Sequence, residues 1–300
     1  MIYLFAYFQF KANHMTIERQ GDYFVYTLVG NVWIRTEKYE ITSGKGIYYE
    51  SDSLAELFEN VFVRGPGYIL KSDYLKYRTD GSYLLVKGGV YLEDSLRIIE
   101  AGWIEVIDDV ARARDSVYVF LKNRNVAVWG DSALYNINSG RGKVWGRIRI
   151  EILRDTDTVH IDTRFLEFGP RNLRAIPLIR LVSSREEARG DTLDYVLNRD
   201  STESAIIRGS GYVKWSDGVG YADTVNILYR NNVLLKAVFS GNARITQRDS
   251  SRTIHIEADL VRVEFGRGDV SRVWSEGIGK AYIREENPPA GEGKEEDQSR

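Results

Sequence analysis

The chain has 300 residues, of which 43% are hydrophobic and 28% carry charge, so it can bury a sizeable core. Its formal net charge of −2 gives no electrostatic basis for binding nucleic acid, and we expect no nucleic-acid partner. The absence of cysteine excludes disulfides, thiolate catalysis and cysteine metal ligands. Nineteen Tyr, six Trp and eleven Phe against five Pro favour a strand-rich fold.

The N-terminal segment, residues 1–24, begins with the apolar run MIYLFAYFQF. A run of ten residues is too short to cross a membrane, because a spanning helix needs about 20. Two interpretations stay open for this segment: it is the remnant of a secretory signal, or it is an edge strand.

From residue 25 onward, pairs of aliphatic residues two positions apart recur along the chain. Their first members lie 29, 29, 27 and 31 residues apart, and the pairs are Val32/Ile34, Val61/Val63, Val90/Leu92, Val117/Val119 and Ile148/Ile150. A spacing this regular indicates a structural repeat.

A second motif keeps step with the first. It reads small residue, often Asp, any residue, aliphatic, any residue, then aromatic or β-branched. Its copies are SDYLKY (72–77), GDSALY (130–135), GDTLDY (190–195), ADTVNI (222–227) and ADLVRV (258–263), with looser copies GKGIYY (44–49), AGWIEV (101–106) and TRFLEF (163–168). We expect the small residue where a strand bends, and the Asp outside, in a turn at the strand's entry.

The alternation of apolar and polar residues predicts antiparallel strands of about six to ten residues with one buried face. Turn residues separate them, as in TSGKG (42–46), RGPG (64–67), TDGS (79–82), NSGRG (138–142) and SDG (216–218). Two stretches, 51–60 and 183–190, read instead as short helices with a capping residue. One hairpin cannot bury its apolar face alone, so the repeats are expected to stack into one continuous interior.

The repeat weakens around residues 169–190, where two of the five prolines lie. We therefore divide the chain into a first repeat half (25–168), an irregular hinge or insertion (169–190) and a second repeat half (191–284). Residues 285–300 are charged and contain Pro and Gly, which predicts a disordered polar tail.

The candidate catalytic residues are the recurring acids Asp73, Asp131, Asp191, Asp223 and Asp259. Paired acids suit glycoside hydrolysis, but one acid at the same place in every repeat is typical of a structural turn residue, which we favour. The histidines His14, His160 and His255 have no partner at ligand spacing. We expect no catalytic residues, no metal and no cofactor.

The units GNVWIRTEKYEITSGKGIYY, LKSDYLKYRTDGSYLLVKGGVYL and WGDSALYNINSGRGKVWGRIRI resemble the OstA-like (LptA) family of lipopolysaccharide transport, over roughly residues 25–284. The resemblance implies an elongated, repeat-built β-jellyroll in which two antiparallel sheets form an open V-shaped groove for lipid acyl chains. The residues alone leave open whether that groove is open or closed. The candidate groove-lining residues are Val32, Ile34, Ile47, Tyr49, Val61, Val63, Leu75, Tyr77, Val90, Leu92, Ile104, Val106, Val117, Val119, Leu166 and Phe168.

The function that the resemblance implies is non-enzymatic transport of lipopolysaccharide between the inner and outer membranes, in the periplasm. The partners implied are lipopolysaccharide or a related glycolipid, other proteins of the transport bridge bound by edge-strand pairing, and further copies of the chain arranged end to end. Two alternatives remain: a carbohydrate-active β-solenoid enzyme, and a purely structural β-solenoid.

Overall fold

The computed structural model describes residues 9–36, 38–153, 157–197, 202–230, 233–249, 251–266, 269–277 and 279–285. The described residues form an all-β, repeat-built fold of consecutive antiparallel hairpins, which confirms the predicted fold class. Searching these residues for a helix long and apolar enough to cross a membrane finds none. The two predicted helices are wrong: strand β5 (Leu54–Gly65) covers most of the first and strand β14 (Glu187–Gly190) ends the second.

The chain divides into two compact units, Met1–Ile176 and Pro177–Arg300. The boundary falls within strand β13 (Asn172–Val182), inside the segment 169–190. That segment also holds β14, so much of it is strand. The apolar residues 1–8 and the tail residues 286–300 lie outside the described residues.

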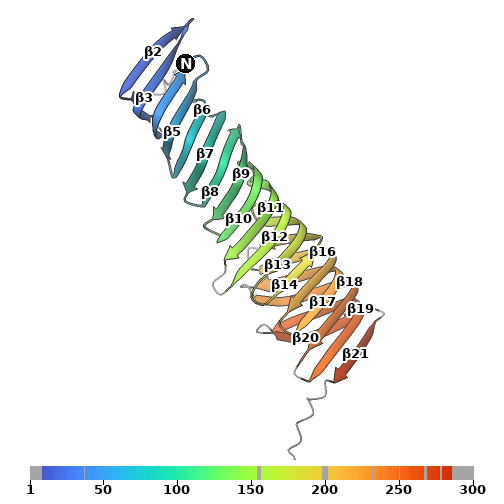
Figure 1. Ribbon diagram of the computed structural model, residues 1–300. Coiled ribbons are helices and arrows are strands. Elements are labelled where there is room, and N and C mark those ends of the chain that lie inside the picture. The colour runs from blue at the N-terminus through green and yellow to red at the C-terminus, as the bar shows by residue number, and fades with distance from the viewer. Residues whose placement is uncertain are drawn as a thin grey trace, which may run out of the picture. The chain divides into compact units, whose positions relative to one another are not determined.

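Unit 1 is a succession of strands in which each strand from β3 to β12 pairs antiparallel with the next (Figure 1). At its N-terminal end, two short strands, β1 and β2, pair with different halves of β3. Besides β5, the strands are β1 (Gln9–Lys11), β2 (His14–Gln20), β3 (Tyr23–Arg35), β4 (Glu40–Tyr49), β6 (Tyr68–Arg78), β7 (Tyr83–Asp94), β8 (Arg97–Ile107), β9 (Val110–Leu121), β10 (Val126–Asn136), β11 (Arg141–Leu153) and β12 (Thr158–Phe168).

Unit 2 repeats the same plan. Strands β14 and β15 pair with different parts of β16, strands β16 to β19 pair in chain order, and β20 and β21 pair with different parts of β19. The remaining strands are β15 (Thr192–Leu197), β16 (Thr202–Trp215), β17 (Gly218–Arg230), β18 (Val233–Arg248), β19 (Arg252–Gly266), β20 (Asp269–Glu276) and β21 (Lys280–Glu285).

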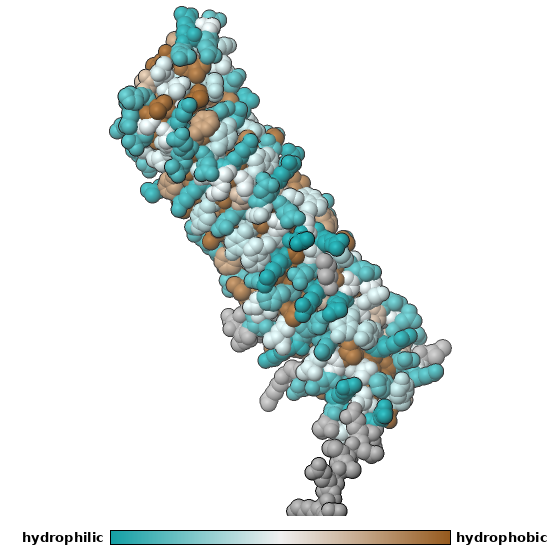
Figure 2. Space-filling model, in the orientation of Figure 1, coloured by the Kyte–Doolittle hydropathy of each residue, from teal (hydrophilic) through white to brown (hydrophobic). Residues whose placement is uncertain are grey.

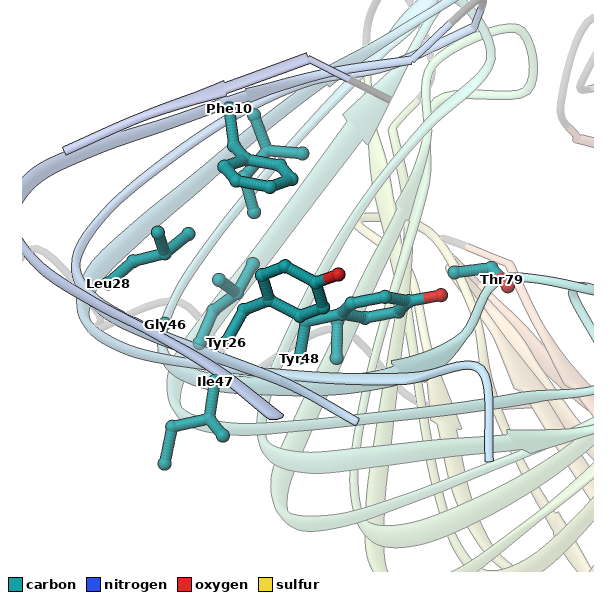
Figure 3. A pocket seen from close by; sticks show the side chains of 10 residues that line it. Phe10, Tyr26, Leu28, Gly46, Ile47, Tyr48 and Thr79 are labelled. Atoms are coloured by element: carbon teal, nitrogen blue, oxygen red, sulfur yellow. The ribbon is translucent and has the colours of Figure 1, made fainter. Parts of the chain in front are cut away.

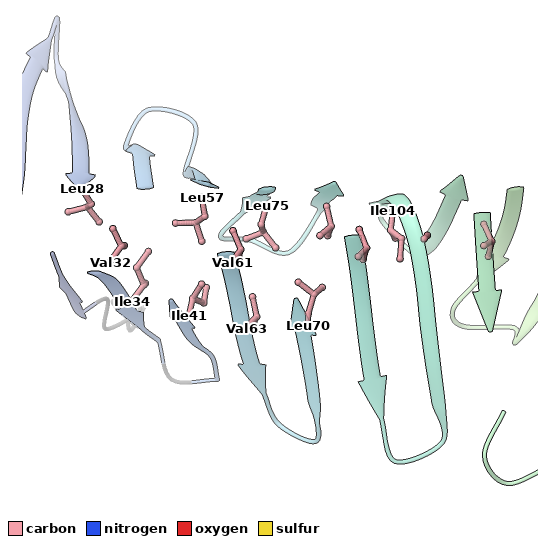
Figure 4. Packing of buried hydrophobic residues seen from close by; sticks show 14 residues of the cluster. Leu28, Val32, Ile34, Ile41, Leu57, Val61, Val63, Leu70, Leu75 and Ile104 are labelled. Carbon is pink, nitrogen blue, oxygen red and sulfur yellow. The ribbon is translucent and has the colours of Figure 1, made fainter. Parts of the chain in front are cut away.

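The strands are longer than predicted because each long one continues through a bend in its middle. The pairing of β6 with β7, for example, shifts register between Lys71 and Tyr74. On β7 this bend holds two residues with positive φ, Gly88 and Gly89, a backbone conformation that glycine adopts without strain. In unit 1 the bends produce two layers, and Figure 4 shows the buried aliphatic side chains packed between them.

The small-Asp motif is the sequence mark of this bend. Asp73 on β6 faces Gly88 on β7 so closely that a Cβ on Gly88 would overlap the carboxylate. The same arrangement recurs as Asp131 with Gly146, Asp191 with Gly209, Asp223 with Gly241 and Asp259 with Gly277. The Asp side chains are exposed as expected. Four of them lie at a bend within a strand rather than at its entry, and Asp191 lies between β14 and β15.

Two repeats exchange the two residue types. Gly102 occupies the Asp position of β8, and the acid that it faces is Asp115 on β9. Gly44 on β4 likewise faces Glu59 on β5. The glycine-rich run 42–46, predicted as a turn, is therefore a mid-strand bend in β4. A small residue is needed on one side of each bend because the acid occupies the space on the other.

The first residue of the motif is buried at the same bend. Where that residue is Ser43, Ser72 or Thr163, its hydroxyl donates to the carbonyl two residues further on, over 3.0, 3.2 and 3.1 Å. This local bond satisfies a polar group that would be costly to bury without a partner. The prediction that the small residue marks a strand bend is confirmed.

Candidate functional site

Most predicted groove-lining residues lie between the two layers of unit 1. Two have side chains that are only 8% and 2% exposed, Ile104 and Leu166. The residues of the list that belong to one buried cluster are Val32, Ile34, Val61, Val63, Leu75, Val90, Ile104 and Val117. Tyr77, Leu92, Val106 and Val119 are partly buried against that cluster, and Phe168 stacks on Tyr135 with ring centroids 6.1 Å apart.

Ile47 and Tyr49 are placed differently. In β4 the residues paired with interior positions of β5 are Gly46 and Tyr48, which lie opposite Leu57 and Ala55. Because side chains alternate along a strand, Ile47 and Tyr49 point to the other face. Figure 3 shows Ile47 pointing away from the rings of Tyr26 and Tyr48. The motif copy in β4 therefore begins at Ser43, which corresponds to Ser72 in β6, and not at Gly44.

In the middle of unit 1 the space between the layers is filled by the protein itself. Val86 has no exposed surface and Val90 is 2% exposed. Arg97 lies over the ring of Tyr135 at 5.7 Å. These two residues stand at strand ends on opposite sides of the bends, as their register partners Leu121 and Ala111 show, so this contact joins the layers.

Unit 2 is filled in the same way. Trp215 is 3% exposed and packs against Phe239 and Phe265, at centroid distances of 6.1 and 5.7 Å. Trp215 pairs with Gly218 before the bend of β17, whereas Phe239 pairs with Val225 beyond it. The aromatic rings therefore occupy the space between the layers.

The N-terminal end of unit 1 differs, because apolar side chains of the interior face are exposed there. Every residue of β2 is exposed, and Met15 and Ile17 are each 51% exposed. Met15 and Ile17 pair with Leu28 and Tyr26 of β3, and so share their face of the sheet. Figure 2 shows apolar residues close together near this end on the visible side, among polar neighbours.

A cavity of about 200 Å³ lies beside these residues. Its lining comes from strands β1, β3, β4 and β5 and from the residue that follows β6. The lining residues are Phe10, Tyr26, Leu28, Ile34, Gly46, Ile47, Tyr48, Ala55, Leu57 and Thr79. Phe10 meets Tyr26 edge to face at 5.9 Å, and the rings of Tyr26 and Tyr48 are also 5.9 Å apart. Figure 3 shows the aromatic rings around the cavity.

The cavity exists because two small residues stand where other repeats carry larger ones. Gly46 occupies the row that holds Leu57, Leu75 and Val86 on the following strands. Ala55 stands between Tyr48 and Tyr77 in the adjacent row. A Cβ on Gly46 would approach Leu57 Cδ2 to 2.9 Å, so the packing against Leu57 also requires glycine here.

The cavity has an apolar side and a hydroxyl side. In Figure 3 the hydroxyls of Tyr26 and Tyr48 point away from Leu28 and towards Thr79, which is exposed. Burial, with a smaller contribution from Glu50, raises the pKa of Tyr48 above its usual value. Burial also raises the pKa of Tyr77 well above its usual range. Both phenols are therefore protonated at neutral pH.

The cavity lining is mainly apolar and aromatic. Its residues include no carboxylate, no histidine and no cationic side chain. Within the described ranges, no group of three or more His, Cys, Asp or Glu is placed to hold a metal ion. None of the recurring acids is among the lining residues.

The sequence analysis missed most of the cavity: of its lining residues only Ile34 and Ile47 were candidates. The missed signal is the alternating run of Tyr26 and Leu28, which precedes the first regular repeat. No protein-family model matches the chain, and no curated protein matches it.

Proposed function

We propose that the protein binds the acyl chains of a glycolipid, lipopolysaccharide or a relative of it, and carries this lipid between the inner and outer membranes of a cell envelope without catalysing a reaction. The observation that carries the proposal is the open N-terminal end of the groove in unit 1, with its cavity and the exposed Met15 and Ile17. The sequence repeat that resembles the OstA-like family supports it, and this resemblance implies a periplasmic location.

The size of the cavity limits what it holds. Typical small-molecule sites occupy about 300–1,000 Å³, so a cavity of about 200 Å³ accommodates part of one acyl chain and not a whole lipid. Burial of about five CH₂ groups contributes about 4 kcal/mol. The sugars of the lipid, which are well hydrated, would remain in solvent.

The proposal is tested by titrating the full chain with a fluorescent acylated glycolipid, and by mass spectrometry of lipids extracted from the gently purified protein. Phe10→Asp places a carboxylate at the half-buried edge of the cavity, where an acyl chain would desolvate it. We expect this variant to bind the glycolipid at least about tenfold more weakly, which corresponds to about 1.4 kcal/mol.

Lys11→Asp is the matched control. Lys11 follows Phe10 on β1, and it lies over the ring of Trp33 at 5.2 Å on the other face of the strand. A variant at this position changes more charge than Phe10→Asp but leaves the cavity intact, so binding should persist. Equal loss in both variants, or no binding by the parent chain, would contradict the proposal.

A second candidate is a structural scaffold, and the filled interior favours it. Side chains without exposed surface, such as Val86 in unit 1 and Phe239 in unit 2, leave no room for a ligand at those points. A scaffold would yield no lipid on extraction and would show no saturable glycolipid binding. Its melting temperature would also be unchanged by added glycolipid, whereas a ligand that binds the folded state raises it.

A further inference from the structure

Two arginines link the two layers of unit 1 at the strand ends farthest from the bends. Arg97, the first residue of β8, lies over the ring of Tyr135 at 5.7 Å. Arg124, in the turn between β9 and β10, donates from its guanidinium to the carbonyl of Pro170, which follows β12. Both contacts cross the mouth of the groove, by which we mean the space between the strand ends of the two layers.

Both arginines start from the same side of the mouth. Arg124 donates its backbone amide to the carbonyl of Leu121, and Leu121 pairs with Arg97. Arg97 occupies the row in which β9 and β10 carry the apolar Leu121 and Val126. A charge at this half-buried position is costly unless it is paired, and the Asp94 carboxylate accepts from the Arg97 guanidinium over 2.8 Å.

The residues that the arginines reach lie together on the other side of the mouth. Tyr135 pairs with Gly142 of β11, and Gly142 pairs with Phe168, the last residue of β12. The rings of Tyr135 and Phe168 stack across this glycine, with 12° between their planes. A Cβ on Gly142 would approach Phe168 Cζ to 2.3 Å, so the stack requires glycine here. The ring that Arg97 contacts is therefore held in place by its neighbours.

The apolar packing below these links weakens towards the mouth. Val86, close to the bend of β7, has no exposed surface. The interior side chains nearer the mouth are only half-buried, Leu84 and Val106 on one layer and Leu92 and Ile99 on the other. The layers are thus joined by close packing near the bends and by the two arginine links at the mouth.

Unit 2 has a comparable link. The carboxylate of Glu186, just before β14, accepts from the Tyr229 hydroxyl over 2.8 Å. Glu187 pairs with Lys214 beyond the bend of β16, whereas Tyr229 pairs with Glu203 before that bend. This contact also joins strand ends on opposite sides of the bends, with different residue types.

We propose that Arg97 and Arg124 form a clasp that holds the groove of unit 1 closed, and that the two layers part at the mouth when the clasp is released. The bends serve as hinges, since residues such as Gly88 and Gly89 have positive φ and no side chain to resist a change of backbone angle. The clasp is a property of the fold and goes beyond the proposed function. If the chain binds lipid, opening would extend the groove past the cavity.

The test measures how fast a buried thiol reacts in the full chain, which contains no other cysteine. Val86→Cys places the thiol where no surface is exposed, so a bulky maleimide reaches it only when the groove opens. Tyr135→Leu and Arg124→Ala each remove one link. We expect each to speed labelling about three- to tenfold, the factor that one such contact supplies, and the double variant to speed it by about the product.

Arg112→Ala is the matched control. Arg112 forms an ion pair with Glu105 at 3.6 Å on the outer face of the sheet, so its loss should leave the labelling rate unchanged. Val90→Cys, at a position that is 2% exposed beyond the bend, serves as a second reporter if Val86→Cys does not fold.

Urea distinguishes opening from unfolding, because parting of the layers exposes far less surface than unfolding does. A labelling rate nearly independent of urea at low concentrations would support the clasp. A rate that rises steeply from the lowest urea concentrations, an unchanged rate in the double variant, or equal acceleration in Arg112→Ala and Arg124→Ala would overturn it. No lipid enters this measurement, so its failure leaves the proposed function standing, and a failure to bind glycolipid leaves the clasp standing.

Discussion

The effect of a substitution in unit 1 depends on which face of its strand the residue occupies. Ile104 is 8% exposed and pairs with Val86 and Ala113 on the neighbouring strands, within the filled part of the groove. Ile107, on the same strand, is 40% exposed. The two isoleucines, three positions apart, therefore lie in very different environments.

Ile104→Asp should destabilise the empty protein by more than about 3 kcal/mol, because it buries an unpaired charge in a packed interior. Urea unfolding measures this loss, and Ile107→Asp is the control, expected to change stability by less than about 1 kcal/mol. A folded Ile104→Asp protein of nearly parental stability would show that water reaches the groove at this point.

Asp94 holds the turn between β7 and β8. Its carboxylate accepts from the amides of Leu96 and Arg97, over 2.8 and 2.7 Å, and from the Arg97 guanidinium over 2.8 Å. Burial opposes ionisation, but these hydrogen bonds outweigh it and hold the pKa of Asp94 below its usual value. The stabilisation is therefore present above the unfolded-state pKa of about 3.9 and is lost as the pH falls through the lower pKa of the folded state.

Asp94→Asn should cost about 1 kcal/mol at pH 7, because it keeps the size of the side chain but removes its charge. The stability difference from the parent should shrink as the pH falls below the unfolded-state pKa of about 3.9. Chemical unfolding at a series of pH values checks both expectations. A difference that stays constant down to pH 2 would mean that the charge of Asp94 contributes nothing.

At the scale of the strand, the bend determines the repeat. One period of about 29 residues is two strands. At the bends named above an acid packs against a glycine, so that one of the two residues has a positive φ and the missing Cβ of the glycine leaves room for the acid. Gly88 meets both demands, because its φ is +77° and its missing Cβ leaves room for Asp73. Gly67, in a hairpin turn, has a φ of +84° but open space around it.

Substituting these two glycines distinguishes the cost of backbone strain from the cost of a steric contact. Gly67→Ala should cost about 1 kcal/mol, from the backbone conformation alone. Gly88→Ala should cost clearly more, because the added methyl also displaces the Asp73 carboxylate. Combining Gly88→Ala with Asp73→Ser should recover part of the loss in thermal or urea unfolding. Equal costs at the two glycines, without recovery, would refute the pairing of Asp with Gly.

At the scale of the molecule, the unpaired edge strands favour association with other chains. Strand β2 pairs with β3 on one side, and in the described part of the chain no strand pairs with its other side. Strand β21 likewise pairs with β19 alone among the described strands, and Ile283 on it is 61% exposed. Strand edges of this kind pair readily with other chains.

We expect concentration-dependent association through these edges, either between copies of the chain or with proteins of the same fold. Sedimentation velocity across a wide concentration range measures it. Ile17→Lys, on β2, should shift the equilibrium towards monomer, whereas Ile107→Lys, away from the edges, should not. A strict monomer at the highest concentrations would contradict this expectation.

The sequence by itself determined the all-β class, the length of the repeat and most of the interior residues. The alternation of apolar and polar residues and the turn residues are local properties, and they recur in every repeat. It could not determine which residues of β4 face the interior. Ser43 and Gly44 are both small, and starting the motif one residue too late places Tyr49 in the interior instead of Tyr48. It also predicted helix over residues 51–60, where cross-strand pairs such as Glu56 with Lys76, 2.8 Å apart, stabilise a strand instead.

The tertiary structure alone decided where the groove is filled and where it is open. Filling depends on which side chains meet across the layers, as Arg97 and Tyr135 do, and these residues lie far apart in the chain. The cavity arises where Gly46 and Ala55 leave space beside Tyr48, near the end of the stack. The alternation of Tyr26 and Leu28 indicates an interior face here, but no local pattern marks the empty space, because that space depends on how side chains from several strands pack together.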